Sequence, residues 1–335
     1  MRMKEQEPNR TEQLRLFIVG EILSGQFEPG AKLPSERELA ESSGASRVTV
    51  RRAYDQLEAA GIILRNRPRG TRVADSFRAH PGPLESIGLI TTLPHDFSGR
   101  FVEAVSRHAR AADALLVLGI PEPDTGGEQL AIAVKMAARG VKDLIIWGAD
   151  RSFDFRVFER LRILGANMTF FDQVVPGPFA DYVGLDNWAA LEALIGQAEA
   201  DGAAHFRFLT RSDLNVDTNA EREAAFLDIM QKIGTSFDIV RLPRTGGALP
   251  PFPAAAPAAC ICVNAPLLQS VFRAPLPGVR LYCVDRPPSV PGTPATGYRQ
   301  PIDAMAREAV DSLRRQRKGR EPGQVRRFAG ELVTI

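Results

Sequence analysis

Arginine side chains gather in one short stretch of this chain, residues 43–72. The stretch holds seven arginines and two acidic residues, Asp55 and Glu58, although the whole chain of 335 residues has a net charge of only +2. A guanidinium group can donate two hydrogen bonds to O6 and N7 of guanine, and it can also neutralise a phosphate. The alternative is an arginine-rich surface that is merely solvated. Because these arginines coincide with helix caps, a turn and a hairpin, we favour nucleic-acid binding.

Two short helices are predicted to position these arginines. Ser35 follows a proline and stands three residues before Glu38, which is the spacing of a capping box at a helix start. Gly44 is expected to end this helix, and Ser46 to cap the next one. In the second helix, apolar side chains repeat at helical spacing and predict an inward face made of Val50, Ala53, Tyr54 and Leu57. The sequence therefore predicts a helix–turn–helix, which presents the start of its second helix to base edges in the major groove.

The residues at the start of the second helix suit that role. Arg47 can pair with guanine, and Arg37 and Arg51 can neutralise phosphates. The hydroxyl groups of Ser35 and Ser46, together with N–H groups at the helix N-termini, can bind phosphate oxygens. We therefore expect Arg47 to read bases and its neighbours to position the protein on the duplex.

Three segments complete this pattern: a helical apolar repeat over residues 11–24, GQFEPGAKLPSER at 25–37, and SRVTVR at 46–51. With them, residues 1–75 resemble the GntR family of winged helix–turn–helix regulators. The resemblance implies that the following residues contact DNA: Ser35, Arg37, Ser46, Arg47, Thr49 and Arg51. It also implies a wing, a basic hairpin over residues 67–73, whose tip at Arg69 and Gly70 approaches the minor groove. Pro68 departs from the family pattern, which has a second glycine in the wing.

The overall composition is that of a globular protein with room for a small domain and a larger one. Hydrophobic residues make up 44% of the chain, which is ordinary for a protein that buries a core. No apolar run approaches the roughly 20 residues of a membrane span, and the N-terminus lacks the apolar stretch of a signal peptide. We therefore expect a cytoplasmic protein. Its three cysteines, Cys260, Cys262 and Cys283, are expected to be buried free thiols that hold no metal.

Three regions are expected along the chain: a DNA-binding domain at 1–75, a proline- and glycine-rich linker at 76–84, and a larger domain at 85–335. In the larger region, apolar runs alternate with helical segments, which is typical of parallel sheets with helices on both faces. A first series predicts strands at 87–92, 115–120, 143–147 and 167–171, with helices at 99–112, 128–139 and 153–164. A second series begins at residue 182 and predicts strands at 206–210, 237–242, 259–263 and 280–284, with helices at 189–200, 219–233, 267–272 and 302–315.

Short polar motifs accompany these elements: FDQ at 171–173, VGLDN at 183–187, AEREAAF at 220–226, VD at 284–285 and RQPIDAM at 299–305. In this order they resemble the effector-binding domain of the LacI family, which is similar to periplasmic sugar-binding proteins. The resemblance implies a two-lobed α/β domain with parallel sheets and a ligand cleft. By the same resemblance, a ligand would be hydrogen-bonded by Asp172, Arg222, Asn264 and Asp285.

The chemistry of these residues fits a polyol. Carboxylates accept hydrogen bonds from two hydroxyls each, and a guanidinium donates to neighbouring oxygens. Phe97 follows the first strand and is expected to stack on a sugar face. The alternatives are that Asp172 and Asp285 only cap turns, and that Arg222 pairs with an acid such as Glu223.

Two features depart from the LacI pattern. Asn264-Ala265-Pro266 stands where that family has an Asn-Asp pair, and the preceding loop, residues 246–257, is rich in proline and alanine. An alternative is therefore a degenerate cleft that binds no sugar and serves only for dimerisation. We interpret the basic tail at residues 314–320 as a solvated helix end rather than a second DNA contact.

Together these patterns predict a transcriptional regulator, and a repressor rather than an activator, whose affinity for double-stranded operator DNA is modulated by a small molecule such as a sugar. A homodimer is expected, because it would place two heads on a two-fold related operator. An enzyme is not expected, because the chain lacks a Gly-x-Ser-x-Gly elbow, a phosphate loop and His-Glu-x-x-His, and its four histidines are scattered. No cofactor is expected. The alternating strands disfavour the all-helical, metal-binding effector domain of other GntR regulators.

Overall fold

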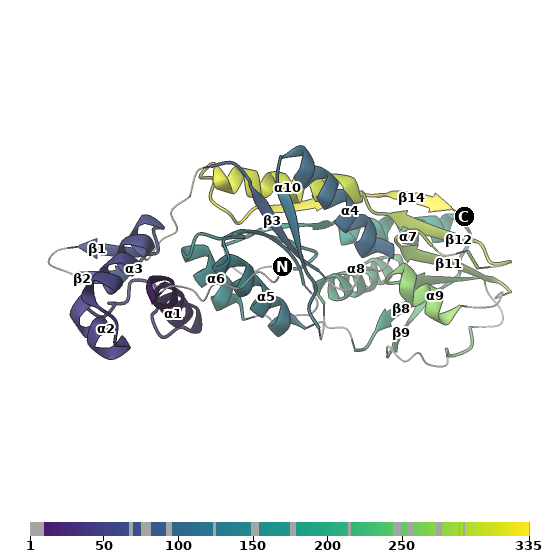
Figure 1. Ribbon diagram of the computed structural model, residues 1–335. Helices are drawn as coiled ribbons and strands as arrows, with labels where there is room; N and C mark the ends of the chain where they lie inside the picture. Colours follow the sequence, from purple (N-terminus) through teal and green to yellow (C-terminus); the bar gives the residue numbers. More distant parts are fainter. Residues whose placement is uncertain are drawn as a thin grey trace, which may run out of the picture.

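The computed structural model of the chain describes residues 10–66, 70–74, 82–91, 96–122, 125–148, 154–174, 179–213, 216–243, 249–252, 257–272, 277–287, 289–290 and 292–334. Figure 1 shows an elongated molecule, with a small head at one end and two α/β lobes beyond it. The lobe next to the head is called lobe 1, and the far lobe, where the chain ends, is called lobe 2.

The described part of the head consists of α1 (Arg10–Ser24), α2 (Glu36–Ser43), α3 (Arg47–Ala59), β1 (Ile63–Asn66) and β2 (Gly70–Val73). The predicted capping box is present: the Ser35 hydroxyl accepts from the N–H of Glu38 at 3.2 Å, and the Glu38 carboxylate accepts from the N–H of Ser35 at 2.7 Å. Gly44 ends α2 with a left-handed φ of +64°, and Ser46 caps α3. The prediction of a helix–turn–helix followed by a hairpin is therefore confirmed, but the first strand of the hairpin, β1, lies before the predicted range 67–73.

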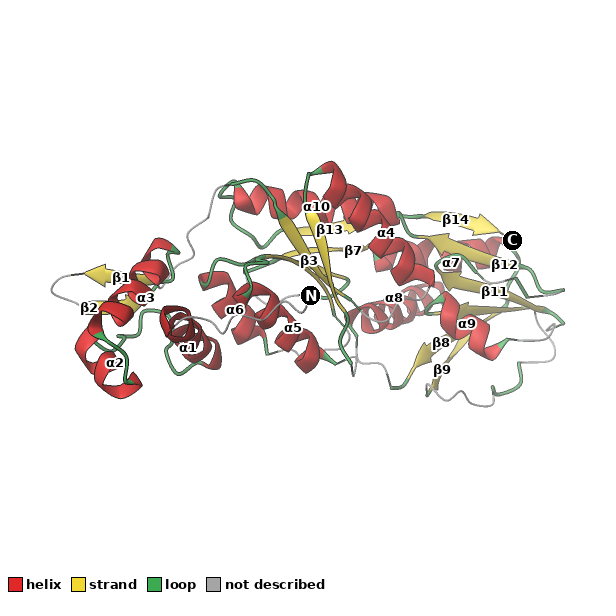
Figure 2. Cartoon of the chain, in the orientation of Figure 1, coloured by secondary structure: helices red, strands yellow, loops and turns green. Residues whose placement is uncertain are grey.

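Lobe 1 is built on a parallel six-stranded sheet in the order β13-β7-β6-β5-β3-β4. Its strands are β3 (Ser86–Ile90), β4 (Leu115–Gly119), β5 (Asp143–Trp147), β6 (Asn167–Phe171), β7 (Asp181–Leu185) and β13 (Val325–Phe328). Helices α5 (Gly126–Ala138) and α6 (Phe155–Ile163) lie on one face, and α4 (Asp96–Ala111) and α10 (Ile302–Arg317) lie on the other (Figure 2). Successive residues of β5 pack into two different apolar cores, because Leu144 and Ile146 belong to one core and Ile145 to the other.

Lobe 2 contains a second six-stranded sheet in the order β14-β12-β11-β10-β8-β9, in which β14 alone runs antiparallel. Its strands are β8 (His205–Arg211), β9 (Ser236–Leu242), β10 (Ala258–Cys262), β11 (Val279–Val284), β12 (Ala295–Arg299) and β14 (Glu331–Thr334), and its helices are α7 (Asn187–Ala200), α8 (Asp217–Ile233) and α9 (Ala265–Val271). All three cysteines are buried free thiols in this lobe, as predicted, and burial raises the pKa of Cys262 and Cys283.

The chain crosses between the lobes three times, and this corrects the division made from the sequence. The second series was expected to begin at residue 182, but the residues there form β7, a strand that was not predicted and that pairs with β6 in the first sheet. The chain enters lobe 2 at α7, returns through α10, adds β13 to lobe 1, and ends as β14 in lobe 2. β12, β13 and β14 were also not predicted, because they are short strands with polar residues among the apolar ones.

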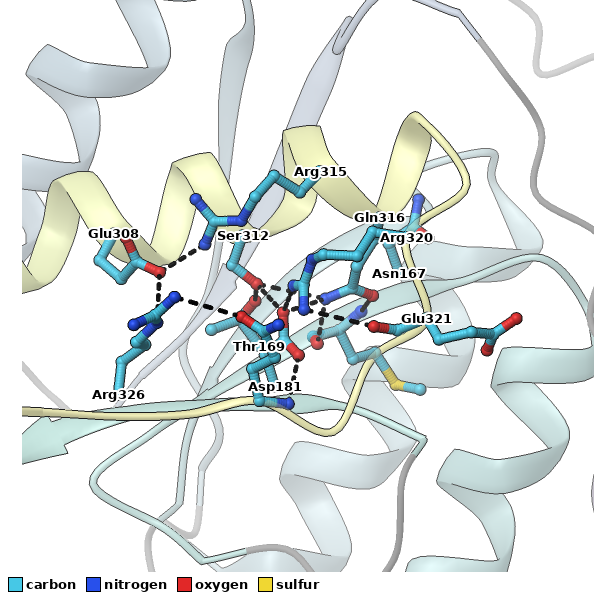
Figure 3. A network of polar contacts seen from close by, with 12 residues as sticks. Asn167, Thr169, Asp181, Glu308, Ser312, Arg315, Gln316, Arg320, Glu321 and Arg326 are labelled. Carbon is cyan, nitrogen blue, oxygen red and sulfur yellow. Dashed lines mark hydrogen bonds and ion pairs between the residues drawn. The ribbon is translucent and has the colours of Figure 1, made fainter.

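A buried polar network joins α10 to the strands of lobe 1 (Figure 3). The side chain of Gln316 donates to the backbone oxygen of Met168 at 3.0 Å and accepts from its N–H at 3.2 Å, and Ser312 lies 2.7 Å from the Thr169 hydroxyl. Asp181, which is 2% exposed, accepts hydrogen bonds from Ser312, Gln316 and Arg320. Because buried polar groups are costly without partners, this matched set specifies where the returning helix docks.

The basic tail is therefore not simply a solvated helix end, and that interpretation is wrong in part. Arg317 donates to the buried carboxylate of Asp143 at 2.9 Å, and Arg320 pairs with Asp181. These arginines balance acids inside lobe 1, and the sequence pattern alone does not show such partners.

Within the described ranges, no helix combines the length and the apolar character needed to cross a membrane.

Candidate DNA-reading surface and interlobe site

The start of α3 presents side chains to solvent. Arg47 and Val48 are exposed, Val48 by 60%, whereas Val50 is fully buried against the rest of the head. The Ser46 hydroxyl accepts from the N–H of Thr49 at 3.1 Å and lies 2.8 Å from the Thr49 hydroxyl, so both groups take part in the helix cap. Arg47 thus stands beside the partly positive N-terminus of α3, where a polyanion is favoured.

Two further exposed arginines accompany this surface. Arg51 donates to Glu36 at 3.0 Å, and Nε of Arg37 lies 3.7 Å from the Glu41 carboxylate. The side chains of Arg51 and Arg37 are 64% and 68% exposed. Ion pairs this exposed contribute little to stability, so either arginine can exchange its carboxylate partner for a phosphate at small cost.

Arg65 differs from the exposed Arg37, Arg47 and Arg51, because its side chain is only 26% exposed. It donates to Asp55 at 2.7 Å and to the backbone oxygen of Arg51 at 3.2 Å, and its guanidinium lies 5.6 Å from the centre of the Tyr54 ring. Burial raises the pKa of Tyr54 to about 12, and its hydroxyl donates to the Pro34 oxygen at 2.6 Å. Arg65 therefore fixes the hairpin to α3. This role of Arg65 was not predicted, because its sequence position shows only a basic charge.

Gly70 begins the second strand of the hairpin. Its φ is +79°, in the left-handed region that favours glycine, and it pairs with Asn66 across the hairpin. Arg69, the residue expected at the wing tip, lies outside the described residues, as does Pro68. The hairpin is present, and its contact with a minor groove stays a prediction.

Asp172 and Asp285 each end a strand in the left-handed backbone conformation, with φ of +54° and +86°. Asp172 follows β6 in lobe 1, and Asp285 follows β11 in lobe 2. Such conformations cost on the order of 1–3 kcal/mol in residues other than glycine and cluster at functional sites. Both carboxylates therefore stand at the carboxyl ends of strands, where open α/β sheets bind their ligands.

Arg222 of α8 joins these two carboxylates at one site. Its side chain, in a residue only 4% exposed, donates to Oδ1 of Asn187 at 2.7 Å and to the backbone oxygen of Val263 at 2.8 Å. Burial raises the pKa of Asp172 to about 6, the charge of Arg222 lowers it, and the charge of Asp285 raises it further. The structure thus brings Asp172, Arg222 and Asp285 within electrostatic reach of one another. It also shows that the partner of Arg222 is an amide and not the acid Glu223.

Asn264 and Phe97 have structural partners of their own. Asn264 caps α9, with its side-chain oxygen accepting from the N–H of Leu267 at 2.9 Å. Phe97 is 7% exposed and packs in an aromatic cluster, with its ring centre 5.3 Å from that of Trp147 and 6.4 Å from that of Phe171. Their roles as ligand contacts stay predictions. The side-chain oxygen of Asn264 is already hydrogen-bonded, and the ring of Phe97 has little exposed surface.

Four buried side chains that were not predicted as ligand contacts lie near the same edges of the sheets, although two of them belong to the quoted motifs at 171–173 and 299–305. Each has a polar atom without a hydrogen-bond partner among the described residues: Thr91 Oγ1, Gln173 Oε1, Asn219 Nδ2 and Gln300 Oε1. Three of them follow the carboxyl ends of β3, β6 and β12, and the fourth lies in the first turn of α8. A polar residue directly after a strand is a signal that could have found Thr91 and Gln300. Unpaired buried polar atoms are rare, and a ligand with both donors and acceptors would satisfy this set.

Hydrogen bonds connect the lobes beside this set. The side chain of Gln173 donates to Asp217 of α8 at 2.6 Å, and the N–H of Val174 donates to the same oxygen at 2.9 Å. Where the chain crosses, Glu221 accepts from Arg327 at 2.9 and 3.0 Å and from Asn187 at 2.7 Å. Burial opposes the ionisation of Glu221, but these hydrogen bonds leave its pKa below the usual value. The site therefore lies next to contacts that a change in lobe angle would alter.

Comparison with known proteins divides the chain in the same way. Residues 11–73 match the family described as bacterial regulatory proteins, gntR family. The arabinose metabolism transcriptional repressor of Geobacillus stearothermophilus is 35% identical over 95 residues, which is 28% of this chain and 26% of that protein. The HTH-type transcriptional regulator Mce2R of Mycobacterium tuberculosis is 46% identical over 65 residues, 19% of this chain and 27% of that protein. The chain thus spans about a quarter of the length of these curated relatives.

Solved structures resemble the two lobes. A LacI transcriptional regulator from a Rhodococcus species aligns with a TM-score of 0.61 at 18% identity, over 74% of this chain and 96% of that one. A periplasmic binding protein/LacI transcriptional regulator from Alkaliphilus metalliredigens, complexed with D-xylulofuranose, gives 0.58 at 12% identity, over 74% and 97%. A putative ribose operon repressor from Burkholderia thailandensis gives 0.60 at 17%, over 75% and 99%. The chain therefore carries a gntR-type head on a body with the periplasmic-binding-protein fold, as the sequence predicted.

The raised pKa of Asp172 predicts how stability depends on pH. The carboxyl holds its proton up to about pH 6 in the folded protein but only to about pH 3.9 in an unfolded chain. The contribution of the Asp172 carboxyl to the free energy of unfolding is therefore fully present below pH 3.9, and it is lost as the pH rises through 6. We expect the free energy of unfolding of the wild type, relative to Asp172→Asn, to fall by about 2–3 kcal/mol between pH 4 and 7.5.

Urea unfolding of both proteins at several pH values measures this difference. Asp228→Asn is the matched control, because Asp228 pairs with Lys232 at 2.6 Å on the outer surface of α8. The control should follow the wild type. A constant difference between wild type and Asp172→Asn across the range would contradict the buried carboxyl.

Proposed function

We propose that this protein is a DNA-binding transcriptional regulator, and a repressor whose hold on operator DNA is modulated by a small polyhydroxylated molecule, such as a sugar, bound between the lobes. The observation that carries the proposal is the exposed, Ser46-capped start of α3, which presents Arg47 on a gntR-type head. The similarity of the head to curated transcriptional regulators supports it. Action on chromosomal DNA implies a protein of the cytoplasm, and a regulator of this kind needs no catalytic activity.

The head would divide its contacts between bases and backbone. Arg47 would donate to a guanine in the major groove, and Arg37 and Arg51 would leave their exposed carboxylates for phosphates. Ser35, Ser46 and Thr49 already cap helices, so their part is to aim N–H groups and hydroxyls at phosphate oxygens. Arg69 and Gly70 would reach the minor groove from the wing.

The interlobe site suits a ligand that carries several hydroxyls. The side chains around it supply acceptors at Asp172, Asp285 and Gln173, and donors at Arg222 and Asn219. A hydroxyl both donates and accepts, so a polyol matches this mixture. Ligand held by both lobes would change their angle, and the coupling to DNA would be reciprocal.

A second candidate keeps the DNA-binding role but gives the lobes no ligand. Two observations favour it: the side chain of Asn264 is used as a helix cap, and Phe97 is packed among Trp147 and Phe171. In that case the lobes would serve dimerisation alone.

A homodimer is part of the proposal, and β4 is the surface that we assign to it. β4 forms the edge of the lobe 1 sheet, where it pairs with β3. Residues 114–121 contain no charge, and large apolar side chains are exposed there: Leu115 by 74%, Leu118 by 48%, Ile120 by 39% and Val117 by 36%. An uncharged apolar edge is normally covered. A second copy related by a two-fold axis would cover it with the same residues, and it would supply the second head.

Replacing Arg47 by alanine tests the assignment of the reading helix. We expect affinity for a sequence selected from random double-stranded DNA to fall about 5- to 150-fold, corresponding to the 1–3 kcal/mol of a bidentate base contact, and the preference at one base pair to disappear. Arg51→Ala should weaken all sequences alike and reduce the salt slope by about one. Titration at fixed salt measures both.

The control for this comparison is Arg156→Ala, because the Arg156 side chain is 82% exposed on α6, away from α3. It should bind like the wild type. A wild-type protein that selects no sequence, or an Arg47→Ala variant with unchanged preference, would contradict the proposed function.

A thermal-shift series with pentoses, hexoses and their acids separates the two candidates. A ligand at 100 times its dissociation constant should stabilise the protein by about 2.7 kcal/mol. Arg222→Lys should abolish that shift, because lysine lacks the planar group whose Nε and Nη1 bond Asn187 and Val263 and leave Nη2 for a ligand. Asp228→Asn should retain it. If no compound shifts the wild type, the ligand-free candidate is favoured.

Leu118→Asp is expected to convert the dimer to a monomer, because it places a charge in the middle of the apolar edge of β4. Sedimentation equilibrium measures the molar mass. Leu332→Asp is the matched control, since Leu332 is 39% exposed on the edge strand β14 of lobe 2. If Leu118→Asp stays dimeric while it remains folded, β4 is not the interface.

A further inference from the structure

Helix α1 packs on two sides. Within the head it contacts α3, and outside the head it contacts α5 and α6 of lobe 1 (Figure 1). One continuous apolar core includes Ile18 and Val50 of the head together with Phe158 and Leu161 of α6. The head is therefore seated on lobe 1 by buried apolar surface and not held by its covalent connection alone.

Arg160 of α6 marks the polar part of this junction. Its side chain is 9% exposed, and its Nη2 donates to Oε1 of Glu28 in the head at 2.9 Å. The guanidinium also lies against Gly25, directly after α1, where a Cβ atom would stand 2.5 Å from Nη2. Gly25 has a φ of +84°, which glycine adopts freely. The loop after α1 is thus shaped to receive this one guanidinium.

Such a contact fixes direction as well as proximity. A charge-assisted hydrogen bond from a guanidinium has a defined geometry, and the guanidinium of Arg160 is held in place by burial, although the Glu28 side chain is 62% exposed. Apolar packing alone permits sliding and rotation. Arg160 therefore restricts the angle at which the head can sit.

The direction of α6 connects this junction to the interlobe site. α6 follows the carboxyl end of β5, where its first turn is capped by Asp154, and it ends just before β6 begins. It therefore runs from the ligand edge of the sheet to the edge that faces the head, a span of about 14 Å for nine residues. A shift at the ligand edge is carried to Arg160 along a rigid element.

We propose that Arg160 is the positioning residue that sets the angle of the head on lobe 1, and thereby the spacing of the two half-sites that a dimer binds. The inference rests on the proposed function, because half-sites presuppose a dimer on DNA. Adding one base pair between half-sites turns one of them by about 35° around the helix axis. A head held at one angle accepts few spacings, and a released head accepts many.

Binding to a set of DNAs that differ only in the spacing of two identical half-sites tests the proposal. Wild type should discriminate about tenfold or more against spacers one base pair too long or too short, and Arg160→Glu by less than about threefold. Affinity for a single half-site should not change. Combining Glu28→Arg with Arg160→Glu restores an ion pair and should restore the spacing preference. The control variant Arg156→Glu, on the exposed side of α6, should keep the wild-type spacing preference.

Spin-label distances give a readout without DNA. Spin labels at Glu41→Cys of α2 and Lys135→Cys of α5, both exposed positions, report the angle between the head and lobe 1. Labelled protein is mixed with excess unlabelled protein, so that each measured distance lies within one chain. We expect a narrow distribution in wild type and in the double reversal, and a broad one in Arg160→Glu.

The two readouts separate this proposal from the proposed function. If wild type selects no DNA, the proposed function fails, and the spin-label widths decide whether Arg160 positions the head. Three outcomes would each overturn the proposal. They are equal distance distributions in wild type and Arg160→Glu, an unchanged spacing preference in Arg160→Glu, and a double reversal that does not recover the spacing preference.

Discussion

Glu221 holds together segments that the chain brings from three distant places. Its carboxylate, on α8, accepts from Arg327 of β13 and from Asn187, the first residue of α7. Both partners stand where the chain passes between the lobes. Asn187 in turn accepts from Arg222, so the same chain of hydrogen bonds orients the guanidinium in the candidate site. The arrangement of the crossings and the shape of the site therefore depend on one half-buried, ionised carboxylate.

Arginine has two separate tasks in this molecule. Arg317 and Arg320 balance carboxylates inside lobe 1, and Arg65 fastens the hairpin of the head to α3. Arg37, Arg47 and Arg51 remain exposed. Arg37 and Arg51 form exposed ion pairs that a phosphate can replace at small cost, and no ion pair of Arg47 is seen among the described residues. A basic composition therefore says little by itself. The burial of each guanidinium and of its partner decides whether it stabilises the fold or is available to a phosphate.

Lobe 1 connects the two ends of the molecule. The core on its α5–α6 face continues into the head, whereas the core on its α4–α10 face continues into lobe 2. One sheet, with side chains that alternate between these faces, therefore contacts both partners. Close-packed protein interiors transmit strain. Because lobe 1 is packed against the head, a change in the angle between lobe 2 and lobe 1 is expected to reach the head.

The head and most helices and strands were determined by local sequence. The Ser35–Glu38 capping box, the Gly44 terminus and the apolar face of α3 depend on residues three or four apart, and all of them formed as expected. The strands β5 and β6 match their predicted bounds because their side chains are buried on both faces and read as continuous apolar runs.

Tertiary structure alone decided which sheet each strand joins and which polar groups meet. β7 belongs to lobe 1, and β13 and β14 add to different sheets. Pairing of β13 with β7 joins residues more than a hundred positions apart, which no local pattern records. The sequence named Asp172, Arg222 and Asp285, but it could not show the amide partner of Arg222, the cap made by Asn264 or the unpaired atoms of Thr91 and Gln300. Spacing along a chain records contacts within one element, whereas burial and hydrogen-bond partners arise only when distant elements are packed together.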